Sequence, residues 1–390
     1  MKIKGVRTFL MQAGASGGTS FASSRNWLFV KIDTDDGITG IGECSGWPRV
    51  VETAVKDLAA LLIGEDPRDI ERLWQKLYVG QMGHGMTGTV GTGAIAGLEM
   101  ALWDIKGKAL NTPVWNLLGG KTRERVRLYA HAKTPAKALS LKQRGYTAIK
   151  GGGVSGVVAQ VAALREAVGA EMDIMVDLHG PPWLTPADAI TLAKALEPYG
   201  LLFVEDPVPP DNLDALARVR EAVDVPLAAG ERWGTIWGAA ALIERGLVDV
   251  IQPDTGRFGG LSAMRKLAAI AEAHHVMVAP HSGSLGPVAE FAALHLLASI
   301  PNALMLERLE DDWPERNTII TKPPVIEAGH MLVPDAPGLG VDIDEAAVAR
   351  YPSTRNVGDA AGDYEPGTAR EHVYVQARLH RAATFSAKPK

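Results

Sequence analysis

The stretch from Ala148 to Arg308 is a series of short apolar runs, and each run ends in a charged residue or an imidazole. The runs read Ala148-Ile-Lys150, Ile174-Met-Val-Asp177-Leu-His179, Leu202-Phe-Val-Glu205, Leu227-Ala-Ala-Gly-Glu231, Val250-Ile-Gln-Pro-Asp254, Val278-Ala-Pro-His281 and Leu304-Met-Leu-Glu307. From Asp177 the polar ends succeed one another at steps of 28, 26, 23, 27 and 26 residues. One strand, one helix and two loops take about this length, so the spacing predicts a repeating β/α unit.

The polar ends of these runs are expected to meet. Buried parallel strands are short Val/Ile/Leu-rich runs, and a charged group after such a strand has to emerge into a shared cleft to stay solvated or paired. In a β/α barrel the carboxyl ends of the strands surround the active site. A single acid after a strand is most often a helix N-cap, but six polar ends in register indicate a functional rim.

The barrel region divides into eight predicted strands and seven predicted helices. The first strand is Val126–Ala130, and the others end near the polar residues of the seven runs. The helices are predicted at roughly 135–144, 156–168, 186–198, 211–223, 235–245, 260–275 and 286–299. After Glu307 the pattern dissolves into Pro-rich loops. Residues 121–328 are therefore predicted to form an α/β fold, a modified (β/α)7β barrel of the TIM type.

Residues 1–120 are predicted to form an α+β capping domain. Residues 1–11 alternate like a strand, Asn26–Glu43 is typical of a hairpin, and helical periodicity covers 50–62, 68–78 and 91–110. Two Gly-rich segments, at about 13–24 and 80–91, are expected to be loops, and the second is either a flexible connector or a lid. Residues 329–390 are expected to pack back on this domain and to end in a polar tail.

Composition excludes several kinds of partner. The net charge is -5 and no run is rich in Lys and Arg, which argues against nucleic acid and an acidic membrane. The single cysteine, Cys44, excludes an intramolecular disulfide and fits a reducing compartment. The N-terminus lacks the features of a signal peptide, and no apolar run has the length of a membrane helix. A soluble, cytoplasmic protein is expected.

Three of the polar ends, Asp177, Glu205 and Glu231, are carboxylates that terminate successive strands. Three carboxylates in a confined site do not all stay ionised without a cation. A hard divalent ion with oxygen ligands resolves this, and Mg²⁺ is the usual choice. The alternative is that each acid forms its own salt bridge with a nearby base such as Arg232.

Asp254 and His281 end consecutive strands on the other side of the rim. A carboxylate that holds one nitrogen of an imidazole fixes the ring and raises its pKa, so the other nitrogen is a better base. Alone, the pair also fits a structural hydrogen bond; facing a metal site, it predicts a catalytic base. His179 comes two residues after Asp177 and points the same way in an extended segment, so it is expected across from His281.

Lys150 and Glu307 complete the predicted rim. Lys150 either pairs with a substrate carboxylate or with the neighbouring acids, and Glu307 is predicted to donate a hydrogen bond to a carboxylate oxygen if its pKa is raised. The candidates for substrate binding are Lys150, Arg232 and His84. These groups suit removal of a proton α to a carboxylate, since they would stabilise charge that develops on the carboxylate oxygens. With His281 as base and His179 protonating a departing β-hydroxyl group, the reaction is a dehydration.

The motifs resemble the mandelate racemase subgroup of the enolase superfamily, whose members use a Lys or His base with Mg²⁺ to stabilise an enediolate. The resemblance is carried by Val176-Asp-Leu-His-Gly180, Val204-Glu-Asp-Pro207, Gly230-Glu-Arg232, Gln252-Pro-Asp254, Ala279-Pro-His281 and Leu285-Gly-Pro287. Within the subgroup they look most like the galactonate dehydratase type. The resemblance implies one Mg²⁺ per subunit, an acid sugar substrate, a homo-oligomer, His281 as base, His179 as general acid and substrate-specifying loops at 13–24 and 80–91.

Two departures from the family pattern bear on function. Racemases and several lactonising relatives have a second lysine on the second strand, and Gly152 stands there in this chain, which argues against two-base racemisation. Pro181-Pro182-Trp183 replaces a polar run after His179, which leaves the particular sugar open. The preferred hypothesis is a Mg²⁺-dependent dehydratase of an aldonate or related acid sugar that yields a 2-keto-3-deoxy acid. The alternatives are an epimerase or cycloisomerase using the same intermediate, and a sugar-acid-binding protein without turnover.

Overall fold

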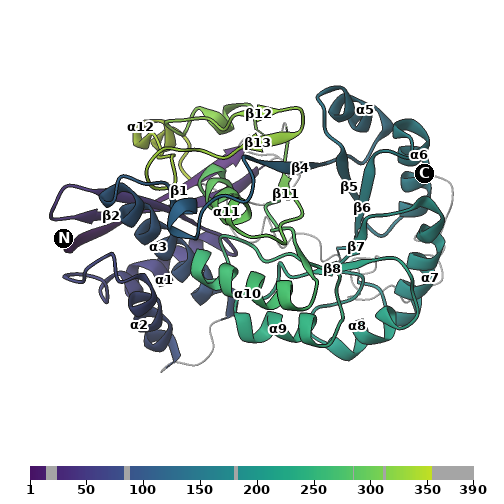
Figure 1. Cartoon of the computed structure of the whole chain (residues 1–390), viewed down its shortest axis with the longest axis horizontal. Helices are drawn as coiled ribbons and strands as arrows, with labels where there is room; N and C mark the ends of the chain where they lie inside the picture. Colours follow the sequence, from purple (N-terminus) through teal and green to yellow (C-terminus); the bar gives the residue numbers. More distant parts are fainter. Residues whose placement is uncertain (15–23, 83–87, 180–182, 284, 311–312, 354–390) are drawn as a thin grey trace.

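The computed structural model describes residues 1–390 except for 15–23, 83–87, 180–182, 284, 311–312 and 354–390. Its larger part is a barrel of eight parallel strands (Figure 1). The strands are β4 (Arg125–His131), β5 (Ala148–Gly152), β6 (Asp173–Asp177), β7 (Phe203–Glu205), β8 (Leu227–Ala229), β9 (Val250–Ile251), β10 (Met277–Val278) and β11 (Leu306–Arg308). Neighbours in the chain pair in parallel from β4 to β10, β11 pairs with β4, and a bridge between Val278 and Ala303 closes the ring.

Seven α-helices connect the eight strands. They are α5 (Pro135–Gln143), α6 (Val157–Val168), α7 (Pro186–Leu196, continued by the 3-10 helix η1, Glu197–Tyr199), α8 (Leu213–Arg220), α9 (Ile236–Glu244), α10 (Leu261–Ala273) and α11 (Pro287–Ser299). After β11 the described residues form only a short 3-10 helix, η2 (Pro314–Asn317), where a regular barrel has its eighth α-helix. The predicted (β/α)7β fold is confirmed. Within the described ranges, none of the helices has the length and apolar character needed to cross a membrane.

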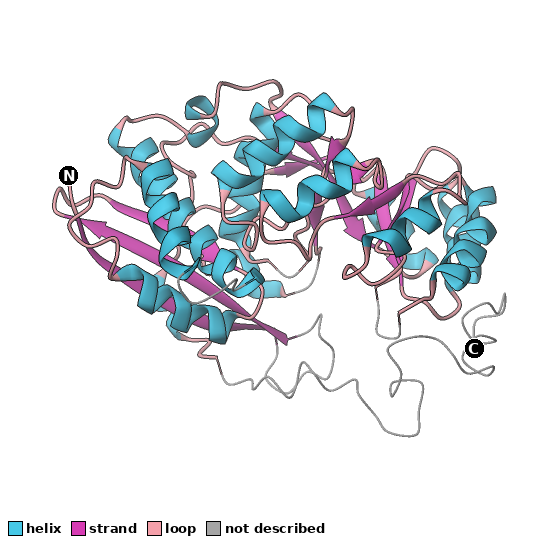
Figure 2. Ribbon diagram, turned by 90° about the horizontal axis from the view of Figure 1, so that it is seen from below, coloured by secondary structure: helices cyan, strands magenta, loops and turns pink. Residues whose placement is uncertain are grey.

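The N-terminal part forms an α+β cap beside the barrel (Figures 1 and 2). Its antiparallel sheet contains β1 (Ile3–Gly14), β2 (Ser24–Thr34) and β3 (Thr39–Cys44), and its helices are α1 (Pro48–Ala59), α2 (Ile70–Met82), α3 (Gly88–Ala109) and α4 (Val114–Leu117). The predicted hairpin is the β2–β3 pair. Helix α3 packs closely on β3 because Gly42 has no side chain: a Cβ there would lie 1.9 Å from the carbonyl oxygen of Gly97.

The segment after the barrel contacts both parts of the molecule. Strands β12 (Ile326–Glu327) and β13 (His330–Leu332) form a hairpin, and β13 pairs antiparallel with residues 125–127 of β4. Residues 128–131 of β4 pair with β11 and β5. Strand β13 therefore provides hydrogen-bond partners for the backbone of residues 125–127, which come before the parallel pairing begins. Helix α12 (Glu345–Ala349) packs near β1, and Pro352 bridges to Met11. The first part of this segment thus lies on the barrel and its later part on the cap.

Eight buried side chains fill the barrel interior, and they form a cluster separate from the main hydrophobic core. They are Tyr129, Ala148, Met175, Phe203, Ala228, Val250, Ala279 and Met305. Large and small side chains are mixed around the ring. The barrel is therefore a packed core rather than a channel, as is usual for this architecture.

Two buried carboxylates of the cap bind the N-termini of barrel helices. Glu43 of β3 accepts hydrogen bonds from two backbone amides at the start of α11. Glu99 of α3 accepts from the amides of Leu261 and Ser262 at the start of α10, at 2.8 and 2.9 Å. The first amides of a helix have no partner within the helix, so these carboxylates satisfy them and tie the cap to the barrel.

Candidate active site

The polar residues at the ends of the strands point toward the inside of the barrel, as the side chains of the interior cluster do. Residues two apart in a strand point the same way. Seven polar residues each come two positions after a member of the interior cluster: His131, Lys150, Asp177, Glu205, Gln252, His281 and Glu307. Glu231 is out of step because Gly230 turns the chain with a φ of 151°. A Cβ at Gly230 would lie 2.6 Å from the backbone nitrogen of Gln252, so no other residue fits there.

Lys150 is the centre of a buried ion-pair cluster. Its side chain is 2% exposed, and its Nζ lies 2.8 Å from Glu307 Oε1, 2.9 Å from Glu205 Oε2 and 3.5 Å from Asp177 Oδ2. Burial alone would lower the pKa of Lys150, but these acids raise it well above its usual value. Of the two partners considered for Lys150, a substrate carboxylate or the neighbouring acids, the structure shows the acids of the rim.

Glu307 accepts hydrogen bonds from groups of the protein, and the raised pKa on which its predicted role as a donor depended is not found. Its Oε1 accepts from Lys150 Nζ and from His131 Nε2 at 2.6 Å, and its Oε2 accepts from the amides of Ser282 and Gly283 at 2.8 and 2.9 Å. Burial would raise its pKa, but Lys150 and the neighbouring imidazoles outweigh burial and hold the pKa of Glu307 well below its usual value. A carboxylate that accepts from four donors is stabilised in its ionised form.

Asp254 and His281 form the predicted pair. Asp254 Oδ2 lies 2.7 Å from His281 Nδ1, and its Oδ1 accepts from the amide of Gly256 at 2.9 Å. The carboxylate can only accept, so Nδ1 carries the hydrogen and Nε2 is the nitrogen available for proton transfer. Burial lowers the pKa of His281, but Glu231, whose Oε2 is 2.9 Å from Nε2, and Glu307 raise it well above its usual value.

Glu231 contacts both His179 and His281. His179 Nδ1 is 3.5 Å from Glu231 Oε1 and His281 Nε2 is 2.9 Å from Glu231 Oε2, so each oxygen of this carboxylate contacts one imidazole. The ring of His179 stacks on Trp183 with centroids 5.8 Å apart, and the guanidinium of Arg232 lies 4.7 Å from the centroid of the same indole. His179 and Arg232, both predicted site residues, therefore reach the rim, but Arg232 contacts side chains of the protein itself.

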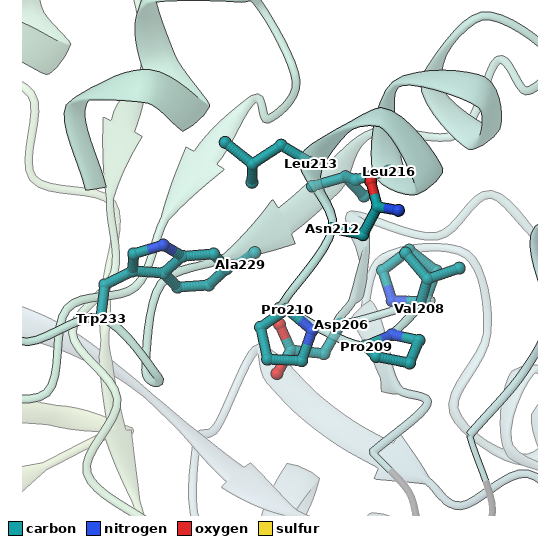
Figure 3. Close-up of a pocket in the computed structure, with 10 residues that line it drawn as sticks. Asp206, Val208, Pro209, Pro210, Asn212, Leu213, Leu216, Ala229 and Trp233 are labelled. Carbon is teal, nitrogen blue, oxygen red and sulfur yellow. The ribbon is translucent and has the colours of Figure 1, made fainter. Parts of the chain in front are cut away.

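Asp206 is a site residue that the sequence analysis missed. It comes directly after Glu205, it is 2% exposed, and it pairs with Arg232 Nε at 3.1 Å. Its φ of 45° is uncommon for a residue with a side chain, and such geometry clusters at functional sites. The pocket behind it is lined by apolar side chains including Pro210 and Trp233 (Figure 3). Burial in these surroundings, together with a neighbouring carboxylate, raises the pKa of Asp206 to about 7.

His131, at the end of β4, was also missed. Its Nε2 contacts Glu307 within the rim. The sequence does contain the signal, because Val126-Arg-Leu-Tyr-Ala-His131 is a mostly apolar segment that ends in an imidazole. The prediction ended this strand one residue earlier, at Ala130, and so left the imidazole out.

The chemistry of the donors fits a hard cation. Asp177 and Glu205 are paired in register, and Glu205 precedes β8 and Glu231 in the ring. Glu205 Oε1 is buried and has no hydrogen-bond partner among the described residues, so it is an oxygen ligand without a counterpart in the protein. A different group, His179, Asp206 and Glu231, brings its ligand atoms within 4.8 Å of one another. The triad Asp177, Glu205 and Glu231 therefore stays a prediction.

Some predicted residues lie outside the described part of the chain. His84 falls in 83–87, and most of the predicted loop at 13–24 falls in 15–23. Residues 80–82 belong to α2 and 88–91 to α3. The predicted polar tail at 386–390 also lies outside the described residues.

Fold and rim together define a class of barrel enzyme in which an α+β cap lies against the barrel that carries the site. Residues 133–347 match the family model described as enolase C-terminal domain-like, and residues 16–119 match the mandelate racemase/muconate lactonizing enzyme N-terminal domain. The chain therefore belongs to the mandelate racemase/muconate lactonizing enzyme family of the enolase superfamily.

Curated relatives and solved structures agree with this assignment. A D-galactonate dehydratase from Ralstonia nicotianae is 38% identical, over 85% of this chain and 92% of its own length, and one from Ralstonia pickettii is 37% identical over the same shares. The crystal structure of a 3,6-anhydro-D-galactonate cycloisomerase from Zobellia galactanivorans is 32% identical, covers 91% of this chain and 100% of its own, and has a TM-score of 0.83. The prediction that the chain is an enzyme, a lyase of the hydro-lyase class, is confirmed by the two D-galactonate dehydratases and the family match.

Proposed function

We propose that the protein is a Mg²⁺-dependent dehydratase of an acid sugar, an aldonate or a related compound, and that its product is a 2-keto-3-deoxy acid. The observation that carries the proposal is the Asp254–His281 pair, which aims an imidazole nitrogen at the carboxylates of the rim at 2.9 Å from Glu231. The similarity to two D-galactonate dehydratases supports the acid sugar as substrate.

In this proposal, residues of the chain act as general base, as general acid and as electrostatic stabilisers. His281 Nε2 takes the proton α to the carboxylate, since Asp254 holds the ring by Nδ1. His179, which contacts the other oxygen of Glu231, donates a proton to the departing β-hydroxyl group. Lys150 places a positive charge where the carboxylate oxygens gain negative charge, and Glu307 holds Lys150 in place.

In this proposal Asp177, Glu205 and Glu231 hold Mg²⁺. The ion would supply a fixed positive charge for the carboxylate oxygens of the substrate and would offset the charge of Glu231, which otherwise favours the protonated form of His281. The buried, unpartnered Oε1 of Glu205 supports this assignment.

A cycloisomerase is the second candidate, because the Zobellia galactanivorans cycloisomerase covers 91% of this chain at 32% identity. Both reactions begin with removal of the α-proton, so His281 would serve either. They differ in the step after proton removal: a dehydratase loses water and forms a 2-keto acid, whereas a cycloisomerase conserves all atoms of its substrate.

The test is a screen of aldonates, aldarates and anhydro sugar acids with Mg²⁺, starting with D-galactonate. We expect a 2-keto product, detected by reaction with semicarbazide and by loss of one water in the mass spectrum. A product of unchanged mass would establish the cycloisomerase or an epimerase instead. Ligand-dependent thermal stabilisation without any product across the whole screen would contradict both enzymatic assignments.

Glu205→Gln is expected to weaken Mg²⁺ binding at least about 100-fold, since loss of a directly bound ligand should cost no less than loss of a supporting group. The measurement is the rise in melting temperature as Mg²⁺ is added, which depends on affinity through mass action. Asp206→Asn is the matched comparison, because Asp206 lies next in the chain and is equally buried. If Asp206→Asn loses the Mg²⁺ response and Glu205→Gln keeps it, the ion is held by the group of His179, Asp206 and Glu231.

We further infer that the protein acts in the cytoplasm and assembles as a homo-oligomer. Cys44 is free and buried, which fits a reducing compartment. Trp47 and Trp237 are 47% and 57% exposed, and aromatic side chains are enriched at interfaces between subunits. Light scattering after size exclusion would test the second statement, and a monomer at assay concentrations would contradict it.

A further inference from the structure

His131 is a rim residue to which the proposed mechanism gives no task. It is the last residue of β4, it pairs in register with Lys150, and it comes two positions after Tyr129 of the barrel interior. Side chains of Glu307 and Lys150 are 0% and 2% exposed, whereas that of His131 is 33% exposed. Of these three contacting groups, the imidazole is the most accessible to a bound molecule.

The contact with Glu307 fixes which nitrogen of His131 carries hydrogen. His131 Nε2 lies 2.6 Å from Glu307 Oε1. Glu307 also accepts from Lys150 and from two backbone amides, so it is an ionised carboxylate and can only accept. Nε2 is therefore the donor. In the neutral ring Nδ1 then has a free lone pair, and no described group donates a hydrogen bond to it.

We propose that His131 is a specificity-determining residue whose Nδ1 accepts a hydrogen bond from a hydroxyl group of the acid sugar, other than the hydroxyl that is eliminated. The inference rests on the proposed function. A neutral nitrogen with a lone pair does not accept a carboxylate as partner, since both are acceptors. A sugar hydroxyl is the group of such a substrate that donates, and a site with an acceptor positioned for it discriminates against molecules that lack it.

Two variants separate this role from mere support of Glu307. In His131→Gln the amide nitrogen reaches the position of Nε2, so the donor to Glu307 is kept and the acceptor at Nδ1 is lost. In His131→Asn the amide occupies the position of Nδ1 and does not reach Glu307. The proposal predicts that Gln lowers kcat/KM by about tenfold or more and that Asn lowers it less. A purely supporting role predicts the reverse order.

The assay is steady-state dehydration of D-galactonate, or of the best substrate from the screen, and of analogues that each lack one hydroxyl group. We expect wild type to discriminate about tenfold or more against one analogue, and His131→Gln to lose that discrimination. Substitution of an exposed histidine at the end of α10, His274→Gln, is the control and should leave both values unchanged.

The outcomes are distinct. If wild type turns over no acid sugar, the proposed function is overturned and the role of His131 falls with it. If wild type is active and either Gln matches wild type or Gln is less impaired than Asn, the His131 inference alone is overturned. If neither variant folds, the assay of the wild type with the analogues still tests the inference. Equal kcat/KM for all of the analogues would overturn it.

Discussion

The substitution His281→Asn is expected to lower kcat by about 10²–10⁴-fold, the range that a positioned general base contributes. Asparagine can still donate to Asp254, which lies 2.7 Å from the imidazole it replaces. Its amide cannot take a proton, so exchange of the α-hydrogen of the substrate with solvent should stop as well. Proton NMR of the substrate in D₂O measures this exchange directly and independently of product formation.

His179→Asn is the variant to compare with His281→Asn, because it separates the roles of acid and base. His179 and His281 contact different oxygens of Glu231, and in the proposed mechanism His179 acts after the α-proton has left. We therefore expect His179→Asn to block dehydration while it spares exchange. Exchange that survives in His281→Asn and stops in His179→Asn would reverse the assignment of base and acid. A Mg²⁺-dependent rise in melting temperature should persist in both variants and would show that the site is intact.

The fold could be predicted because a barrel repeats one local pattern. Each strand after the first was recognised from an apolar run with a polar end, and in several of them the polar end comes two residues after the interior side chain, as Met175 and Asp177 show. Thr134 and Pro135 begin α5 as short-range helix chemistry requires, with the Thr134 hydroxyl accepting from the amide of Lys137. Such signals lie within a few residues of one another in the chain.

The features that the sequence did not predict depend on contacts between strands. Glu307 was predicted to donate a hydrogen bond only if its pKa were raised, but Lys150 and His131, both far away in the sequence, hold its pKa low. The pairing of Asp206 with Arg232 needs a left-handed residue directly after a metal-ligand candidate, and residue type alone gives little sign of it. Charge balance inside a rim is set by all its members together, so it cannot be assigned one residue at a time.

Between about pH 4.5 and 7, Glu99 is expected to make the protein less stable as pH rises. Burial raises the pKa of Glu99 from 4.5 to about 7, and its hydrogen bonds from Ser262, Leu261 and Trp103 offset burial only in part. The folded state then binds a proton that the unfolded state has lost, so the stabilisation is complete below about 4.5 and is lost as pH rises through about 7. A shift of this size corresponds to about 3 kcal/mol.

Glu99→Gln isolates this effect, because glutamine has nearly the same shape and does not titrate. The free energy of unfolding is measured with denaturant at pH 5 and pH 8. From pH 5 to pH 8 the wild type should lose about 3 kcal/mol of stability relative to the variant. The substitution of an exposed acid on α6, Glu166→Gln, is the control and should show no such change. If the difference between Glu99→Gln and wild type is the same at both pH values, the amides at the start of α10 keep the carboxylate ionised throughout, as a helix N-terminus favours. In that case the ionised carboxylate of Glu99, rather than its protonated form, links α3 of the cap to α10, the helix that comes after Asp254.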